Sequence, residues 1–264
     1  MQVDITRGSI WKPLLAFFFP ILLGTFFQQL YNTADAIIVG NFVGKEALAA
    51  VGGTTSVIVS FFVNLFVGVS SGATVVIAQN YGAREYEALQ DGVHTSMALA
   101  LTAGAGIMVL GLLVATPTLK VMDTPEDVMG YAQTYLKIYF LGTIASFIYN
   151  MGSSILRAMG DSKRPLYFLM SACLVNILLD LLFVVKLKME VLGVAIATVL
   201  SQVVAAALVL MALCRKDTLY HLNFRRIRFH KEPLKAILRI GLPAGLQSDM
   251  YSVSNILLQS CVNS

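Results

Sequence analysis

The stretch LLAFFFPILLGTFFQQLYNTADAIIV, from Leu14 to Val39, decides the fold of this chain, and Asp35 is its only charged side chain. A helix needs about 20 predominantly apolar residues to cross the hydrocarbon core of a bilayer. Within lipid, a helix satisfies every backbone hydrogen bond inside its own segment. The stretch therefore predicts a transmembrane helix that carries one carboxyl group into the membrane.

Comparable apolar stretches recur along the whole chain. They cover residues 47–78, 93–115, 128–156, 165–188 and 191–213, and a further one begins near 234 and is still apolar at Ser264. Of all residues 57% are hydrophobic and 13% are charged, whereas soluble domains carry about 25% charged residues. We therefore expect an all-α integral membrane protein with six complete transmembrane helices and the start of a seventh.

The lysines and arginines predict the orientation of these helices. Of 19 such residues, 14 fall on one side of the predicted membrane, mostly in 157–164 and 215–239. The other side receives Lys45, Lys120, Lys137, Lys186 and Lys188. Since positive residues are retained in the cytoplasm, we expect a cytoplasmic N-terminus in a multi-pass protein of the bacterial cytoplasmic (inner) membrane. A basic segment can also bind nucleic acid, but its position beside the membrane favours lipid headgroups, so we expect no nucleic-acid partner.

The beginning of the seventh stretch repeats the spacing of the first. Asn32 follows Pro20 by twelve residues, and Asn255 follows Pro243 by the same twelve. Repeated halves are a common plan of secondary transporters. We therefore predict two lobes, with the rest of the second lobe as a missing partner on the same chain. The predicted units are an N-terminal six-helix lobe (1–213), a cytoplasmic basic linker (214–233) and the start of a C-terminal lobe (234–264).

The first helix carries a polar face. Gln28, Tyr31, Asn32 and Asp35 stand at positions i, i+3, i+4 and i+7, so they share one side of a helix. A polar stripe within a membrane helix must face a polar cavity or another helix. Pro20 lies in the same helix and frees a backbone carbonyl, which predicts a bend that acts as a hinge.

The fifth and sixth helices carry shorter polar faces. Asn176 and Asp180 are four residues apart, and so are Thr198 and Gln202. Hydrogen bonding between helices is the plainer role for neutral polar groups in a membrane. For Thr198 and Gln202, as for Asn32, that alternative and a functional role both stay open.

The carboxyl groups of Asp35 and Asp180 favour a function. An ionisable group in the membrane is costly, and no lysine or arginine lies deep in a predicted span to neutralise either of them. A proton can neutralise a buried acid, and two carboxylates with an amide and a hydroxyl can hold a small hard cation. The sequence therefore predicts a site that exchanges a cation, with Tyr135 and Asn150 of the fourth helix as further polar groups.

Small residues are closely spaced in the second stretch. Gly68 and Gly72 flank Ser70 and Ser71. Small residues at i and i+4 let two membrane helices approach closely. We expect a helix contact at this place rather than a hinge.

Four motifs occur in order along the chain. They are Phe27-Gln-Gln-Leu-Tyr-Asn-Thr-Ala-Asp35, Gly72-Ala-Thr-Val-Val-Ile-Ala-Gln-Asn-Tyr-Gly-Ala83, Leu156-Arg-Ala-Met-Gly-Asp-Ser-Lys-Arg-Pro165 and Asn176-Ile-Leu-Leu-Asp180. With Gly241-Leu-Pro243, they resemble the multidrug and toxic compound extrusion (MATE) family in its prokaryotic DinF-like branch. The resemblance implies twelve helices in two lobes, and export of organic cations or amphiphilic compounds in exchange for protons or sodium ions, without a cofactor.

The resemblance also implies particular site residues. The cation site of the first lobe, a possible sodium site, maps onto Asp35, Asn176, Asp180 and Thr198. The substrate cleft maps onto Gln28, Tyr31, Tyr135 and Asn150, to which the polar faces add Asn32 and Gln202. Asp249 departs from the resemblance, because a small polar residue is expected there. It either adds a second acidic group or faces a wet vestibule.

Three other functions fit the sequence less well. No Walker loop and no zinc-type histidine pair occurs, so we do not expect an enzyme. A lipid-linked sugar flippase of a related fold would predict a cavity rich in cationic groups, whereas the polar faces carry acids. A seven-helix receptor would require the chain to end naturally after its last helix, which is unfinished at Ser264.

Overall fold

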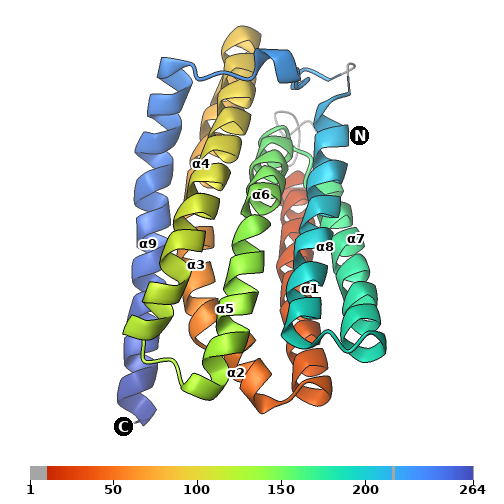
Figure 1. Cartoon of the computed structure of the whole chain (residues 1–264). Helices are drawn as coiled ribbons and strands as arrows, with labels where there is room; N and C mark the ends of the chain where they lie inside the picture. The colour runs from red at the N-terminus through yellow and green to blue at the C-terminus, as the bar shows by residue number, and fades with distance from the viewer. Residues whose placement is uncertain (1–10, 216–217, 264) are drawn as a thin grey trace.

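The computed structural model describes residues 11–215 and 218–263, and these form a bundle of long helices without strands (Figure 1). The orientation prediction also counts Arg7 and Lys216. Both lie outside the described residues. The helices are α1 (Trp11–Phe42), α2 (Lys45–Gly52), α3 (Thr54–Gly82), α4 (Tyr86–Val121), α5 (Glu126–Leu141), α6 (Thr143–Ala158), α7 (Lys163–Asp180), η1 (Leu181–Lys186), α8 (Glu190–Leu213), η2 (Phe224–Arg226) and α9 (Lys231–Asn263).

Every predicted stretch is helical, which confirms the all-α fold. Among the described residues, five segments are long and apolar enough to cross a membrane. They are Leu14–Phe42, Lys45–Gly82, Tyr86–Val121, Lys163–Lys186 and Glu190–Leu213. The seventh stretch forms α9, which begins at Lys231, three residues before the predicted boundary.

The predicted helix over 128–156 is divided at Gly142 into α5 and α6, of 16 residues each. The division coincides with a close contact to α8, because a Cβ at Gly142 would lie 2.7 Å from Val199 Cγ2. The prediction of one continuous helix is therefore wrong here. Apolar composition alone does not indicate where a helix is interrupted.

The outside of the bundle is apolar, as lipid contact requires. Large hydrophobic side chains remain exposed on several helices, for example Leu113 of α4 at 71% and Leu174 of α7 at 61%. Inside, Phe66 of α3 stacks on Phe147 of α6 with ring centroids 3.7 Å apart. An outer surface of large hydrophobic side chains fits hydrocarbon, not water, as the surrounding medium.

The connections between helices that contain most of the described basic residues lie at two opposite ends of the bundle. The α3–α4 and α6–α7 connections and the segment between α8 and α9 share the end drawn at the top, while the α1–α2, α4–α5 and η1–α8 connections share the other (Figure 1). The top segment is held to α4 by three hydrogen bonds, in one of which the Gln90 side-chain amide donates to the Leu219 carbonyl. The Asn223 backbone N–H donates to His94 Nε2 (3.2 Å), and the His230 backbone N–H donates to Thr95 Oγ1 (3.1 Å).

A cavity separates α1 from α3, while α8 packs on both α5 and α6. α1 contacts α2, α7 and α8, whereas α3 contacts α4, α6 and α9. Gly68 and Gly72 of α3 face α9, since a Cβ at Gly68 would overlap the backbone of Gly245. The expected close helix contact at these glycines is confirmed, and its partner is α9.

Candidate functional site

A cavity of about 440 Å³ lies between α1 and α3, with α2, α5, α6, α7 and α8 completing its wall. Its polar lining comes from five helices. These residues are Gln28, Gln29, Tyr31, Asn32 and Asp35 of α1, Ser56, Ser60 and Asn64 of α3, Tyr135 and Tyr139 of α5, Tyr149 of α6, and Thr198 and Gln202 of α8. The volume falls in the usual range for small-molecule sites, about 300 to 1,000 Å³.

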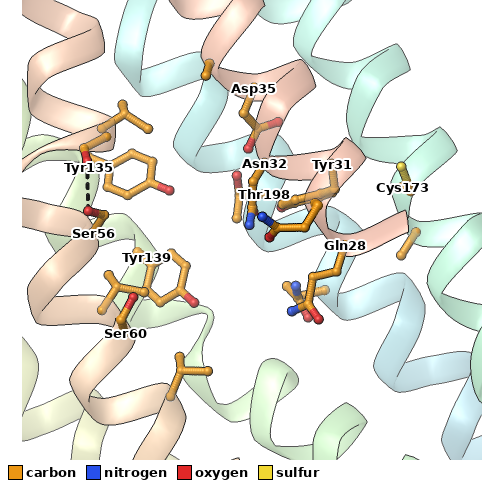
Figure 2. A pocket seen from close by; sticks show the side chains of 18 of the residues that line it. Gln28, Tyr31, Asn32, Asp35, Ser56, Ser60, Tyr135, Tyr139, Cys173 and Thr198 are labelled. Atoms are coloured by element: carbon orange, nitrogen blue, oxygen red, sulfur yellow. Dashed lines mark hydrogen bonds between the residues drawn. The ribbon is translucent and has the colours of Figure 1, made fainter. Parts of the chain in front are cut away.

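The polar face of α1 is directed into this cavity. Gln28, Tyr31, Asn32 and Asp35 all line it, and Figure 2 shows them along one side of the helix. α1 is continuous through Pro20, and Pro20 itself is buried. The sequence alone allowed two neighbours for this polar face, a cavity or another helix. In the structure the face is directed to a cavity.

The opposite wall contains residues that the sequence analysis missed. Ser56, Ser60 and Asn64 of α3 line the cavity, and the Ser56 hydroxyl donates to the Gly52 carbonyl at 2.8 Å. The three residues stand at i, i+4 and i+8, so one face of α3 carries them. That spacing was visible in the sequence, but hydroxyl groups in membrane helices commonly bond to their own backbone and give a weak signal.

Two tyrosines of α5 form an aromatic surface on the cavity. The rings of Tyr135 and Tyr139 stack with centroids 6.0 Å apart and planes inclined by 25°. Figure 2 shows both facing the space opposite Asn32 and Thr198. Stacked tyrosine rings present π faces and hydroxyl groups to a bound molecule, and π faces attract cations.

Asp35 and Asp180 come together behind the cavity wall. Their side chains, on the contacting helices α1 and α7, are close enough for the two carboxyl groups to interact directly. Asp35 is 5% exposed and Asp180 is fully buried. Oδ1 of Asp35 and both carboxyl oxygens of Asp180 have no hydrogen-bond partner among the described residues. A pair of buried acids with unsatisfied oxygens requires a proton or a cation to compensate it.

The other two predicted cation ligands are buried beside this pair. Asn176 is one helical turn before Asp180 and is fully buried, with neither amide atom hydrogen-bonded within the described part of the chain. Thr198 is 3% exposed, its hydroxyl likewise has no hydrogen-bond partner there, and its side chain lies close to Tyr31, one turn before Asp35. The predicted set thus supplies carboxylate, amide and hydroxyl oxygens, which are the ligands that hard cations prefer.

Local backbone geometry sets Asp180 apart. It is the last residue of α7, and a π-helical turn, η1, follows it directly. Single π-helical turns are frequent at functional sites. Nothing in the sequence pattern indicated this turn.

Asn150 does not line the cavity. Its amide nitrogen donates to the Ser146 carbonyl at 2.9 Å within α6. The residue that α6 contributes to the cavity is its neighbour Tyr149, so the structure places the polar group of this helix one position earlier than expected.

The cavity is acidic in its charge. Among the described residues, Asp35 is the one acid that lines it, and no lysine, arginine or histidine does. Two ion pairs, Arg164 with Asp161 and His230 with Asp91, are both 3.1 Å long and belong to the end of the bundle that holds the linker. The unopposed carboxyl group makes the cavity attractive to positively charged molecules.

Apolar helices around a polar, acid-containing cavity define a multi-pass membrane protein. The MatE family model matches residues 20–182, and the chain belongs to this family. It is 31% identical over 261 residues to the probable multidrug resistance protein YpnP of Bacillus subtilis (strain 168), covering 99% of this chain and 58% of that protein.

Further relatives agree with this assignment. YoeA of the same organism, a probable multidrug resistance protein, is 32% identical, with 98% of this chain and 57% of that protein covered. A solved MATE multidrug resistance transporter in an outward-facing conformation is 31% identical, with a TM-score of 0.91 over 98% of this chain and 57% of that one. The chain therefore spans somewhat more than half the length of the relatives it matches and corresponds to their N-terminal portion.

Asp249 of α9 is not in contact with the cation set. It is 4% exposed. Its side chain lies close to Asn64 of α3, a residue that lines the cavity.

Proposed function

We propose that this chain forms the cation-binding half of an antiporter that exports organic cations or amphiphilic compounds in exchange for protons or sodium ions. The observation that carries the proposal is the buried pair Asp35 and Asp180, which have unsatisfied oxygens and of which Asp35 lines the polar cavity. Asn176 and Thr198 complete the proposed cation site.

A cation is required because neither acid has a basic partner among the described residues. The two carboxyl groups would repel one another if both were charged, and burial would add to the cost. One bound sodium ion or one or two protons would remove that cost. The occupied and empty states then differ in charge, and a ligand shifts a conformational equilibrium only by its difference in affinity for the two states.

The exported substrate would bind in the cavity itself. Tyr135 and Tyr139 offer stacked rings, Gln28 and Asn32 offer amides, and Asp35 offers a carboxylate. This combination suits a flat, apolar molecule with one positive charge. Since Asp35 belongs to both the cation set and the cavity lining, binding of substrate and of coupling ion would compete through one residue.

The membrane and the second lobe follow from the same proposal. We expect a bacterial cytoplasmic membrane, with the N-terminus and the α8–α9 linker in the cytoplasm. Transport would need the second lobe that the longer relatives possess, because the chain covers only 58% of YpnP. Residues 1–264 alone should insert into membranes but should not move substrate along a gradient.

The alternatives are less well supported. A flippase for lipid-linked sugars must hold a pyrophosphate, and no basic residue among the described ones lines the cavity. The family relatives are named as multidrug resistance proteins, not as receptors.

Transport measurements test the proposal directly. The complete transporter that contains this chain is reconstituted into liposomes, and efflux of a fluorescent organic cation is followed under an imposed pH gradient and, separately, an imposed sodium gradient. The proposal expects faster efflux under at least one of the two gradients. Equal efflux with and without either gradient would contradict it.

A further inference from the structure

The segment that connects α8 to α9 crosses the end of the bundle, and its described part, residues 218–230, is fixed there (Figure 1). The Leu222 backbone N–H donates to the Leu213 carbonyl of α8 at 2.9 Å, and Nη1 of Arg164 in α7 donates to the Tyr220 hydroxyl at 3.3 Å. The side chains of Tyr220 and Leu222 are 5% and 1% exposed and belong to one hydrophobic core with residues of α4 and α6. Together with its three hydrogen bonds to α4, these contacts hold the segment on three helices.

The same segment presents aromatic rings and guanidinium groups on its exposed surface. Phe224 is 60% exposed and Phe229 is 46% exposed. Arg225 and Arg226 are exposed as well, and neither guanidinium group forms a hydrogen bond or an ion pair with a described residue. Large aromatic rings are unfavourable in water, and guanidinium groups bind anions through charge-assisted hydrogen bonds. This surface is therefore suited to a partner that has both apolar and anionic groups.

Positive charge predominates in and beside this surface. Residues 218–239 contain one acid, Glu232, and six basic residues, all six of which are exposed. The basic residues are Arg225, Arg226, Arg228, Lys231, Lys235 and Arg239. Asp91 of α4 also reaches the segment, where its carboxyl group lies 3.1 Å from His230 Nδ1. A surface with this excess of positive charge attracts anions.

We propose that the α8–α9 segment binds an anionic phospholipid of the adjacent membrane leaflet. Arg225 and Arg226 hold the phosphate group. The rings of Phe224 and Phe229 lie among the first carbons of the acyl chains. The segment begins five residues after Glu190–Leu213, which is long and apolar enough to cross a membrane, so it lies at the level of the lipid headgroups. The proposal does not depend on the transport function proposed above.

A phospholipid satisfies both parts of this surface at once. Guanidinium groups bind phosphate oxygens through paired hydrogen bonds. In interfacial helices that combine basic residues with phenylalanine, the apolar side chains insert at the boundary between headgroups and acyl chains. A free phosphate ion would satisfy the arginines but leave the rings in water. Because contacts to α4, α7 and α8 already order the backbone, binding a lipid requires little further ordering of the segment.

Lipid binding by the complete transporter that contains this chain tests the proposal. The purified protein in detergent is titrated with phosphatidylglycerol and, separately, with phosphatidylcholine of the same acyl chains, and bound lipid is counted by native mass spectrometry. Phosphatidylglycerol should bind more tightly than phosphatidylcholine. In the double variant Arg225→Gln with Arg226→Gln, the affinity for phosphatidylglycerol should fall about 30-fold, the effect of about 2 kcal/mol. The affinity for phosphatidylcholine should stay the same.

A matched control removes two charges at the opposite end of the bundle. Lys186 and Lys188 are both exposed at the η1–α8 connection, and Lys186→Gln with Lys188→Gln should leave both affinities unchanged. An equal loss in this control would show that net charge, and not the α8–α9 segment, selects the lipid, which would overturn the proposal. Equal affinities of the unsubstituted protein for the two lipids would overturn it too. Competition by glycerol phosphate as strong as that by phosphatidylglycerol would make a free anion the ligand and would likewise overturn it.

A spin label at Phe229 measures where the rings lie. The complete transporter, with its native cysteines replaced by alanine, is placed in nanodiscs that contain phosphatidylglycerol in both leaflets, so the outcome does not depend on orientation. Collisions of the label with oxygen report on acyl chains, and collisions with a water-soluble nickel complex report on water. The proposal expects more collisions with oxygen. More collisions with nickel would place this position in water, and few collisions with either would show that the second lobe covers it; both results would overturn the proposal.

Discussion

Replacing Asp35 with asparagine should uncouple export from the cation gradient in the complete transporter. The substitution keeps the size and one oxygen of the side chain but removes its charge. Asp35 is 5% exposed and lies against Asp180, so the change is confined to the proposed cation site. The amide in place of the carboxyl group would hold the site permanently in a state resembling the protonated one.

The size of the effect follows from the loss of one charge. A carboxylate and a cation about 4 Å apart interact by about 4 kcal/mol at an effective dielectric constant of about 20. Since about 1.4 kcal/mol corresponds to a tenfold change in affinity, the full loss would weaken cation binding about 1,000-fold. Asp180 remains and offsets part of this loss, so we expect a decrease of roughly 100- to 1,000-fold.

The assay combines transport with binding. Proteoliposomes carrying the Asp35→Asn protein are loaded with a fluorescent organic cation, and initial efflux is compared with and without the coupling gradient. Substrate binding is measured separately in detergent at several concentrations of the coupling ion. The same carboxyl-to-amide change at Asp123, which is exposed in the α4–α5 connection, serves as the control and should leave gradient-driven efflux unchanged.

Two results would refute the reasoning. Gradient-driven efflux close to the unsubstituted rate in a well-folded Asp35→Asn protein would show that this carboxyl group does not couple the cation to transport. Substrate binding that is independent of the cation in both proteins would leave hydrogen bonding between helices as the role of these residues.

Three other predictions concern the site, the orientation and the contact between α3 and α9. Asp180→Asn should uncouple transport as Asp35→Asn does. Thr198→Ala removes one neutral ligand and should weaken cation binding by about 1 kcal/mol, roughly fivefold. Equal losses of cation affinity in titrations of the two variants with the cation would contradict this. Single cysteines at Arg226 and Asp123, at opposite ends of the bundle, should react with impermeant reagents from opposite sides, the former only from the cytoplasm; labelling of both from outside would overturn the orientation. Gly68→Val should destabilise the α3–α9 contact by about 1 to 3 kcal/mol through overpacking, measured as a lower thermal midpoint.

Gly106 provides the matched control for the Gly68 substitution. A Cβ there meets nothing within 4 Å, so Gly106→Val introduces the same side chain into a helix without a clash. If both variants show the same decrease in thermal midpoint, the effect comes from helix propensity and not from the contact between α3 and α9.

The sequence predicted a good part of the candidate site because helical spacing decides which residues share a face. The face of Gln28, Tyr31, Asn32 and Asp35 could be identified from intervals of three and four, and all four residues line the cavity. Asn150 shows the limit of such reasoning. A polar residue in an apolar helix can satisfy itself on its own backbone, as Asn150 does with Ser146, and the sequence does not distinguish this from a cavity contact.

The sequence by itself determined the medium, the approximate positions of the apolar helical stretches and which ends of these stretches carry most of the positive charge. These properties depend on composition and short-range periodicity, which are local. Only the tertiary structure decided the break at Gly142 and the meeting of Asp35 with Asp180. Only it, too, brought Asn64 to Asp249, 185 positions apart in the chain. Such contacts depend on how whole helices pack, and the packing is set by the summed shapes of many side chains rather than by any one segment.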